Sequence, residues 1–396
     1  MAIDPANANP PTNPLRFQDI IDEFGENNTN SLGGYRMENL NIGGLSEIPL
    51  DADTCGINAN SSIPVDNQEI KFSDFYNSKL NVLVDCYTSN ENRVDAKSKY
   101  TALASAGNYR IIGPKGGDNS NTTETPPSNT SGKKITILVT KEIGSVKSNT
   151  KSRVALNTGT WTTGTDLTIN VRSTGFISGA GGDGAAGSQG NTVGLNGGNG
   201  NSAIGVEYTG GTTKIKTATG AKIRRGFGGG GSGGSGWGDN EEGSKPQLFG
   251  QGSGGGGGAG IPAGLGGEES DFSNFGIYVR EAFLIHNGND GFDGSSTSGG
   301  AGGALPNPAV AGYENGVPTI WRGGAGGAGG DTEQNPAGGG KGACSGEEWQ
   351  GGPTNANGGA AGQNGHAFVA KSGSNIDISQ AATGTITGDT ITGNPT

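Results

Sequence analysis

The sequence has few of the residue types on which most enzymes and cofactor sites depend. Its 396 residues include 3 cysteines and 2 histidines, and only 30% of the chain is hydrophobic. Cys55, Cys86 and Cys344 follow no metal-binding or disulfide spacing. The two histidines, His286 and His366, complete neither a Ser-His-Asp order nor an H-E-x-x-H motif. We therefore expect a protein that is not an enzyme and that holds no cofactor.

The sequence also lacks long apolar runs and clustered positive charge. Its longest apolar runs, "ITILV" and "LNVLV", are far too short to cross a bilayer. The formal net charge is -11, and the tight basic clusters are pairs, Lys133-Lys134 and Arg224-Arg225. Binding to a phosphate backbone needs many clustered Lys and Arg side chains. The sequence therefore predicts no nucleic-acid partner and no membrane insertion.

Glycine is abundant instead, with 81 residues, most of them between positions 175 and 365. This block opens with "FISGAGGDGAAG" and closes its first part with "GGNGNSAIGV". "IRRGFGGGGSGGSG" opens a second part, "IWRGGAGGAGGD" a third, and "GGAAGQNGHAFVA" closes the block. The pattern predicts an imperfect threefold repeat of strand, glycine run, polar loop, glycine run and strand.

Three common explanations of a glycine-rich segment do not fit. "GAGGDG" at residues 179–184 matches G-x-G-x-x-G, but no helix pattern follows it, as a dinucleotide-binding loop requires. The Gly-X-Y register breaks after Gly190, which excludes a long collagen helix. A flexible linker would be neither bounded by Ile, Val, Phe and Trp nor repeated.

The remaining interpretation is packed extended chain of the polyglycine-II type, with three residues per turn. Glycine at every third position leaves one face of such a helix bare, so neighbouring segments can approach closely. Ordering each glycine costs about 0.5–1 kcal/mol relative to alanine. We therefore expect neighbouring subunits to stabilise the block, in a homo-oligomer with a trimer favoured. The glycines expected to pack are Gly181, Gly184, Gly187, Gly324, Gly327 and Gly362.

The rest of the sequence predicts a mainly β protein with a short N-terminal helix. Residues 13–25 place Phe17, Ile20, Ile21 and Phe24 on one helix face. Strand patterns follow within 80–87, 133–144 and 165–177, and the tail predicts one or two exposed or inter-subunit strands. The expected domains are a docking module at 1–87, a β-rich domain at 88–174 with a polar loop at 118–132, a glycine-rich repeat domain at 175–370, and an extended tail at 371–396.

Residues 15–77 resemble a short module found near the N-terminus of many tailed-bacteriophage virion proteins. Its pattern is approximately I-x-F-x-D-I, E-F-G, S-L-x-x-Y, I-P and I-x-F-S-D-F-Y. Arg16-Phe17 and Gly33-Gly34 depart from the usual residues. The matching residues are Phe17, Asp19, Ile20, Glu23, Phe24, Gly25, Ser31, Leu32, Tyr35, Ile63, Pro64, Ile70, Phe72, Ser73, Asp74, Phe75 and Tyr76. The glycine block is similar in composition to those of phage tail fibres and other appendages.

The resemblance implies a structural protein of a virion. Such a protein is assembled into the particle in the host cytoplasm, where it contacts other virion proteins. A tail, baseplate or fibre position is favoured, with a possible role in host attachment. A head decoration or neck protein is an alternative. A bacterial extracellular glycine-rich adhesin or matrix protein is another, although residues 1–15 show no secretion signal. A depolymerase would need paired carboxylates in one cleft. The residues expected to dock on a partner are Phe17, Ile20, Ile21, Phe24, Phe72, Phe75 and Tyr76.

Two groups within the glycine block are candidate binding residues. Trp237, Phe249, Tyr313 and Trp349 lie in or beside polar loops, where they could contact a host glycan or protein. Alternatively, they form a small core at the ends of the glycine runs. Asp290 and Asp293 in "NGNDGFDGS" resemble half of a calcium-binding repeat, although a single copy is more often an Asp-Gly turn.

Overall fold

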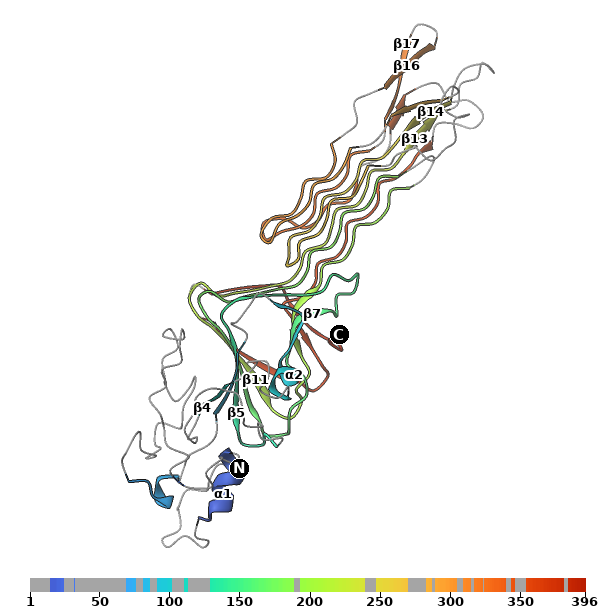
Figure 1. Cartoon of the computed structure of the whole chain (residues 1–396). Coiled ribbons are helices and arrows are strands. Elements are labelled where there is room, and N and C mark those ends of the chain that lie inside the picture. The colour runs from blue at the N-terminus through green and yellow to red at the C-terminus, as the bar shows by residue number, and fades with distance from the viewer. Residues whose placement is uncertain are drawn as a thin grey trace.

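The computed structural model is an elongated molecule in which a body of short strands carries a long glycine-rich extension (Figure 1). Both described ends of the chain lie at the body. The structure describes residues 15–24, 32, 69–75, 81–85, 91–101, 110–112, 129–188, 193–238, 247–269, 283–286, 289–304, 309–314, 317–322, 324–339, 343–345, 354–380 and 384–396. The prediction of a mainly β protein with a short N-terminal helix is confirmed.

The body is a three-sided β-helix, because successive strands along the chain fall on three sheets in turn. The first sheet has the order β21-β11-β8-β5-β1-β4, the second β2-β6-β9-β12-β22 and the third β23-β20-β10-β7-β3. Neighbouring strands within each sheet are parallel, except that β4 is antiparallel to β1 at the edge. Each turn of the β-helix, here called a rung, therefore places one strand on each side.

The rungs follow the order of the chain. The first contains β1 (Asn81–Asp85), β2 (Glu91–Asn92) and β3 (Val94–Asp95), with β4 (Arg110–Ile112) at the edge. The second contains β5 (Lys134–Val139), β6 (Glu142–Gly144) and β7 (Val154–Asn157). The third contains β8 (Asp166–Val171), β9 (Phe176–Ser178) and β10 (Ser202–Val206). The fourth contains β11 (Thr212–Thr217), β12 (Lys222–Arg224) and β20 (Phe368–Ala370). The last contains β21 (Asn375–Gln380), β22 (Thr385–Thr387) and β23 (Thr390–Thr392).

Aliphatic side chains stack in register through the body. On the first side, Ile137 pairs with Ile169, which pairs with Ile215 on the next rung. On the second side, Ile143 pairs with Ile177, which pairs with Ile223. These six side chains are fully buried in one core cluster. Full burial of such a side chain stabilises the fold by about 1.5–3 kcal/mol, so the alternating pattern of the strands supplies the driving force for the rungs.

The strands expected from the sequence lie close to their expected positions, but the tail belongs to the body. β21, β22 and β23 each pair in parallel with a strand of the same chain, β11, β12 and β20 respectively. The sequence predicts exposed or inter-subunit strands in the tail. None of the described side chains of these three strands is buried, and contact with another subunit stays a prediction. The domain boundaries expected at residues 174 and 370 also do not coincide with the limits of the β-helix. Strands β10, β11, β12 and β20 lie between these two positions, but they belong to the β-helix.

The N-terminal helix α1 (Phe17–Phe24) packs onto this core instead of pointing wholly outward. Ile20 is fully buried in the core cluster, and Phe17 packs against the cluster while partly exposed. A second short helix, α2 (Ala96–Thr101), adds Tyr100, whose ring meets that of Trp161 edge-on at 5.1 Å. The expectation that Ile20 faces a partner is corrected, because its side chain is already covered by the chain itself.

We expect Ile20→Ala to lower the free energy of unfolding by about 2–5 kcal/mol, as truncation of a buried aliphatic side chain does. Chemical denaturation of the purified chain measures this value. Phe72→Ala is the control, since Phe72 is 40% exposed. An unchanged stability of Ile20→Ala would show that α1 does not pack on the core in solution.

The glycine stalk leaves the body at one corner of the β-helix. It consists of the segments 179–188, 193–200, 226–235, 251–260, 263–269, 289–294, 299–304, 324–330, 336–339 and 356–365. The first two lie between β9 and β10, and all the others lie between β12 and β20. The glycine block is therefore two insertions into the β-helix and not the expected threefold repeat. The expected third unit, which begins at "IWRGG", starts from β17 (Val317–Arg322) at the far end of the stalk and not from the body (Figure 1).

Candidate functional site

The far end of the stalk carries two small sheets (Figure 1). One has the order β15-β14-β13-β19, built from β13 (Gly236–Gly238), β14 (Gln247–Gly250), β15 (Phe283–His286) and β19 (Thr354–Asn355). The other has the order β16-β17-β18, built from β16 (Ala309–Glu314), β17 (Val317–Arg322) and β18 (Ala343–Ser345). We call these two sheets the distal tip.

Three of the four aromatic candidates lie on distal-tip strands. Trp237 on β13 is the register partner of Phe249 on β14, and Tyr313 on β16 is opposite Pro318 on β17. Trp349 lies outside the described residues, as does Tyr76 of the N-terminal candidates. The fold thus brings to one end residues that are more than 70 positions apart in the sequence. Their roles in binding remain predictions.

Distal-tip strands continue directly from stalk segments. Residues 226–235 lead into β13, and β14 leads into 251–260 without an intervening loop. β19 leads in the same way into 356–365. The position of the tip therefore depends on how rigidly the stalk segments are held together.

Backbone hydrogen bonds join the stalk segments with a three-residue recurrence. Gly181, Gly184 and Gly187 donate in turn to the carbonyls of Pro262, Leu265 and Glu268. The residues that follow the first two, Gly182 and Ala185, donate to the carbonyls of Phe227 and Gly230 in a different segment. Consecutive residues thus donate to different neighbouring segments, and the same neighbour recurs at every third residue.

The central segment, 226–235, is bonded on all sides. It donates hydrogen bonds to segments 193–200, 251–260 and 336–339. It accepts hydrogen bonds from segments 179–188, 324–330 and 356–365. Its residues are all buried, including Ser232 and Ser235. All of these hydrogen bonds join segments of a single chain.

Close approach of backbones is the reason for glycine at these positions. A Cβ atom on Gly181 or Gly184 would run into the carbonyl group of Gly258 or Gly255 respectively. A Cβ on Gly327 or Gly362 would similarly meet the carbonyl of Ala337 or Gly198. Gly324 belongs to the same network, since its N–H donates to the carbonyl of Gly234.

A polar ladder at one side of the stalk was missed by the sequence analysis. The side-chain oxygens of Asn196 and Asn199 accept hydrogen bonds from the N–H groups of Ala360 and Gln363, at 2.8 and 2.7 Å. Ser202 Oγ continues the series by accepting from the N–H of His366 at 2.9 Å. The sequence signal is the three-residue spacing in "NGGNGNS". Every third side chain there accepts a backbone hydrogen bond that the carbonyl of a further segment would otherwise accept.

On another side of the stalk, Asp290 and Asp293 likewise accept hydrogen bonds from backbone N–H groups of an adjacent segment. Asp290 Oδ1 accepts a hydrogen bond from the N–H of Glu269, and Asp293 Oδ1 accepts one from that of Gly266. Their spacing of three therefore matches the repeat of the adjacent segment. Among the described residues, no group of three or more His, Cys, Asp or Glu side chains could hold a metal ion.

The proximal turns of the stalk, near the body, are also held by carboxylates. Asp331 Oδ1 accepts from the N–H groups of Glu333 and Gln334, and its Oδ2 accepts from that of Gly299. Burial alone would raise the pKa of this carboxyl. The three backbone hydrogen bonds and the charge of Arg224 outweigh burial, so the pKa is below its ordinary value. The charged carboxylate thus fixes the turn between two segments.

The N-terminal docking candidates are only partly placed. Phe72 is exposed on the 3-10 turn η2 (Phe72–Phe75), which Phe75 ends. Ile21 and Phe24 lie on α1 beside the buried Ile20. Within the described part of the chain, no helix is both long and apolar enough to cross a membrane.

Comparison of the sequence with protein-family models and with curated proteins finds no match. Among solved structures, the fold resembles the adhesin tip complex formed by gp37 and gp38 of the bacteriophage S16 long tail fibre. The TM-score is 0.33 and the sequence identity 16%, over 82% of this chain and 88% of that chain. A likeness at this level does not transfer a function, so the function has to be argued from the residues of this chain.

Proposed function

We propose that the chain is a non-enzymatic structural protein of a bacteriophage particle, associated with the tail or its fibres, that contributes to host attachment. The single observation that carries this proposal is the arrangement of the molecule. A β-helical body anchors a stalk of hydrogen-bonded glycine segments, and the stalk presents the distal tip well away from the body (Figure 1). The resemblance of residues 15–77 to the phage virion module supports the same assignment.

The two ends of the molecule have different tasks under this proposal. The N-terminal module docks the chain on other virion proteins, and the exposed Phe72 is a suitable contact. The distal tip carries Trp237, Phe249 and Tyr313 towards the host surface. The stalk segments are polyglycine-II-like helices, which the three-residue recurrence of their hydrogen bonds favours.

Gold-labelled antibody against the chain, imaged on intact particles, tests the proposed location. Label at the free ends of tail fibres or at the baseplate is the expected result. Label on the head would favour a decoration or neck protein. Particles without label, together with label on the bacterial surface, would favour an extracellular adhesin and overturn the proposal.

We expect Phe72→Ala to reduce the number of copies of the chain per particle while leaving its unfolding free energy unchanged. Removing an exposed aromatic contact costs binding but little folding energy. Quantitative immunoblotting of purified particles measures the copy number. Val146→Ala is a matched control, since Val146 is 49% exposed on the body outside the N-terminal module. A normal copy number in Phe72→Ala would remove Phe72 from the docking contact.

A further inference from the structure

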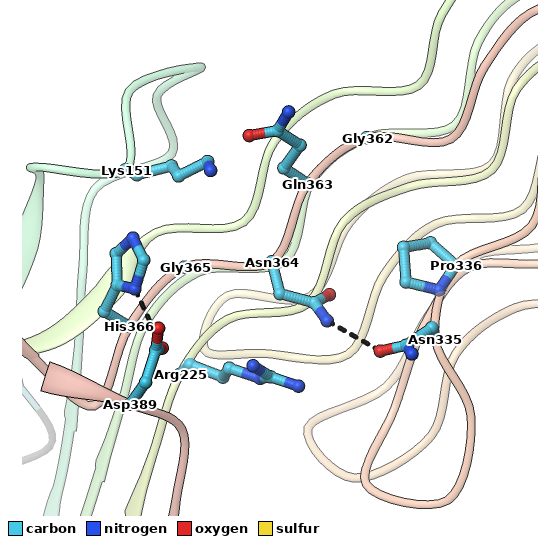
Figure 2. A pocket seen from close by; sticks show the side chains of 10 residues that line it. All are labelled: Lys151, Arg225, Asn335, Pro336, Gly362, Gln363, Asn364, Gly365, His366 and Asp389. Carbon is cyan, nitrogen blue, oxygen red and sulfur yellow. Dashed lines mark hydrogen bonds and ion pairs between the residues drawn. The ribbon is translucent and has the colours of Figure 1, made fainter. Parts of the chain in front are cut away.

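A polar pocket lies at the junction of the body and the stalk, with a volume of about 380 Å³ (Figure 2). Arg225 lines it where the chain leaves β12 for the stalk, and His366 lines it where the chain returns towards β20. Asp389 comes from the short corner between β22 and β23, and Lys151 from the loop before β7. Segments that are far apart in the sequence thus line one pocket that is open to solvent.

Two cations of the pocket, Lys151 and Arg225, lack a close ion-pair partner among the described residues. Arg225 Nε is buried and has no hydrogen-bond partner within the described ranges. The guanidinium carbon lies 5.2 Å from the centre of the Phe227 ring, which supports the group without satisfying its N–H donors.

The one carboxylate of the pocket is already engaged. Asp389 Oδ1 lies 2.8 Å from His366 Nδ1, as the dashed line in Figure 2 marks. Burial tends to raise the pKa of Asp389, but the hydrogen bond to His366 and the charges of His366 and Arg225 lower it below its ordinary value. Asp389 therefore forms its ion pair with His366 and acts on Arg225 only at longer range, and neither Lys151 nor Arg225 lies within ion-pair distance of a described carboxylate.

Side-chain amides supply the rest of the polar surface. Asn364 is fixed at both ends, since its Oδ1 accepts from the N–H of Gly228 at 3.0 Å and its Nδ2 donates to Asn335 Oδ1 at 3.1 Å. Gln363 extends from the opposite side of the same segment (Figure 2). No Phe, Tyr or Trp side chain is among the lining residues, so a flat aromatic ligand would find no stacking surface. Hydroxyl groups are better matched to these amides.

We propose that this pocket binds an anionic sugar residue, with its carboxylate or phosphate group attracted by Lys151 and Arg225 and its hydroxyls on the amides of Gln363 and Asn335. The volume is at the lower end of the range for small-molecule pockets, which suits a single sugar residue. The proposal does not depend on the chain belonging to a phage particle, because it concerns the pocket at the base of the stalk and not the distal tip.

Isothermal titration calorimetry of the full-length chain tests the proposal with four probes: glucuronic acid, glucose 6-phosphate, glucose and inorganic phosphate. We expect at least one of the two acidic sugars to bind, at least tenfold more tightly than glucose and than inorganic phosphate. The acidic sugar that binds identifies the acid group. Equal binding of glucose would overturn the role of the cations, and equal binding of phosphate would overturn the sugar assignment. Absence of binding by both acidic sugars would overturn the proposal.

Substitutions locate the site. Lys151→Gln and Arg225→Gln should each weaken binding of the acidic sugar at least tenfold. Lys371→Gln is the matched control, since Lys371 is an exposed lysine outside the pocket. Thermal unfolding of each variant separates loss of binding from loss of fold. Undiminished binding by a folded Lys151→Gln, Arg225→Gln double variant would place the sugar elsewhere and overturn the proposal.

Discussion

Replacing Gly184 by valine is expected to lower the free energy of unfolding by about 2–6 kcal/mol, since two backbone hydrogen bonds of about 1–3 kcal/mol each are disrupted. A Cβ at this position meets the backbone carbonyl of Gly255, which cannot rotate away as a side chain could. That carbonyl accepts from Gly267, and Gly184 itself donates to Leu265. Separating the segments breaks both contacts. Denaturation of the purified chain measures the loss.

Ala186→Val is the control for this variant, because Ala186 lies in the same segment with its side chain exposed. We expect its stability to remain close to that of the unsubstituted chain. Ser188→Ala is not a suitable control. Ser188 is 3% exposed, and its hydroxyl donates to the carbonyl of Gly233 at 2.7 Å. Equal stabilities of Gly184→Val and Ala186→Val would refute close backbone packing at Gly184.

Trp237→Ala and Phe249→Ala are each expected to weaken binding of the purified chain to host cells by about 30-fold or more. Truncation of a central aromatic contact costs about 2 kcal/mol or more at protein interfaces, and 1.4 kcal/mol is a factor of ten in affinity. The two residues are register partners on adjacent distal-tip strands, so they belong to one small area of the backbone. Titration of fluorescently labelled protein onto cells measures the affinity.

The stalk itself provides the matched control for this experiment. Phe292 is 65% exposed, and its carbonyl accepts from Gly257, a bond within the proximal half of the stalk. We expect Phe292→Ala to bind cells as the unsubstituted chain does. If Phe292→Ala loses as much binding as the two distal-tip variants, contact is not specific to the tip. If neither distal-tip variant loses binding, their aromatic side chains are not the contact residues.

Much of the body could be predicted from local pattern. The alternation of Ile, Val and Thr in "KITILV" and "DLTINV" predicts the strands β5 and β8 because alternate residues share one side of a strand. The helical spacing of Phe17, Ile20 and Phe24 similarly predicts α1. The β-helix itself had a signal that was not used. Gly132, Gly164 and Gly373 each follow a Ser or Thr and precede a first-side strand by two residues, and all have positive φ.

The path of the chain could not be read from such patterns. The glycine runs look alike, so composition alone does not reveal that segments 226–235 and 356–365 are neighbours although their sequence separation exceeds 120 residues. The same difficulty applies to Asp290 and Asp293, because their hydrogen bonds to the adjacent segment cannot be predicted from the local sequence.

Anchoring the stalk as insertions into the β-helix has a mechanical consequence. A force that pulls on the distal tip passes along segments whose proximal ends continue into β9, β10, β12 and β20, strands of the third and fourth rungs. The hydrogen bonds between stalk segments run across the direction of pull, so they are loaded together in shear and not opened one after another. The β-helix strands lie at the base of the same load path. The construction therefore suits a tether that has to hold under tension.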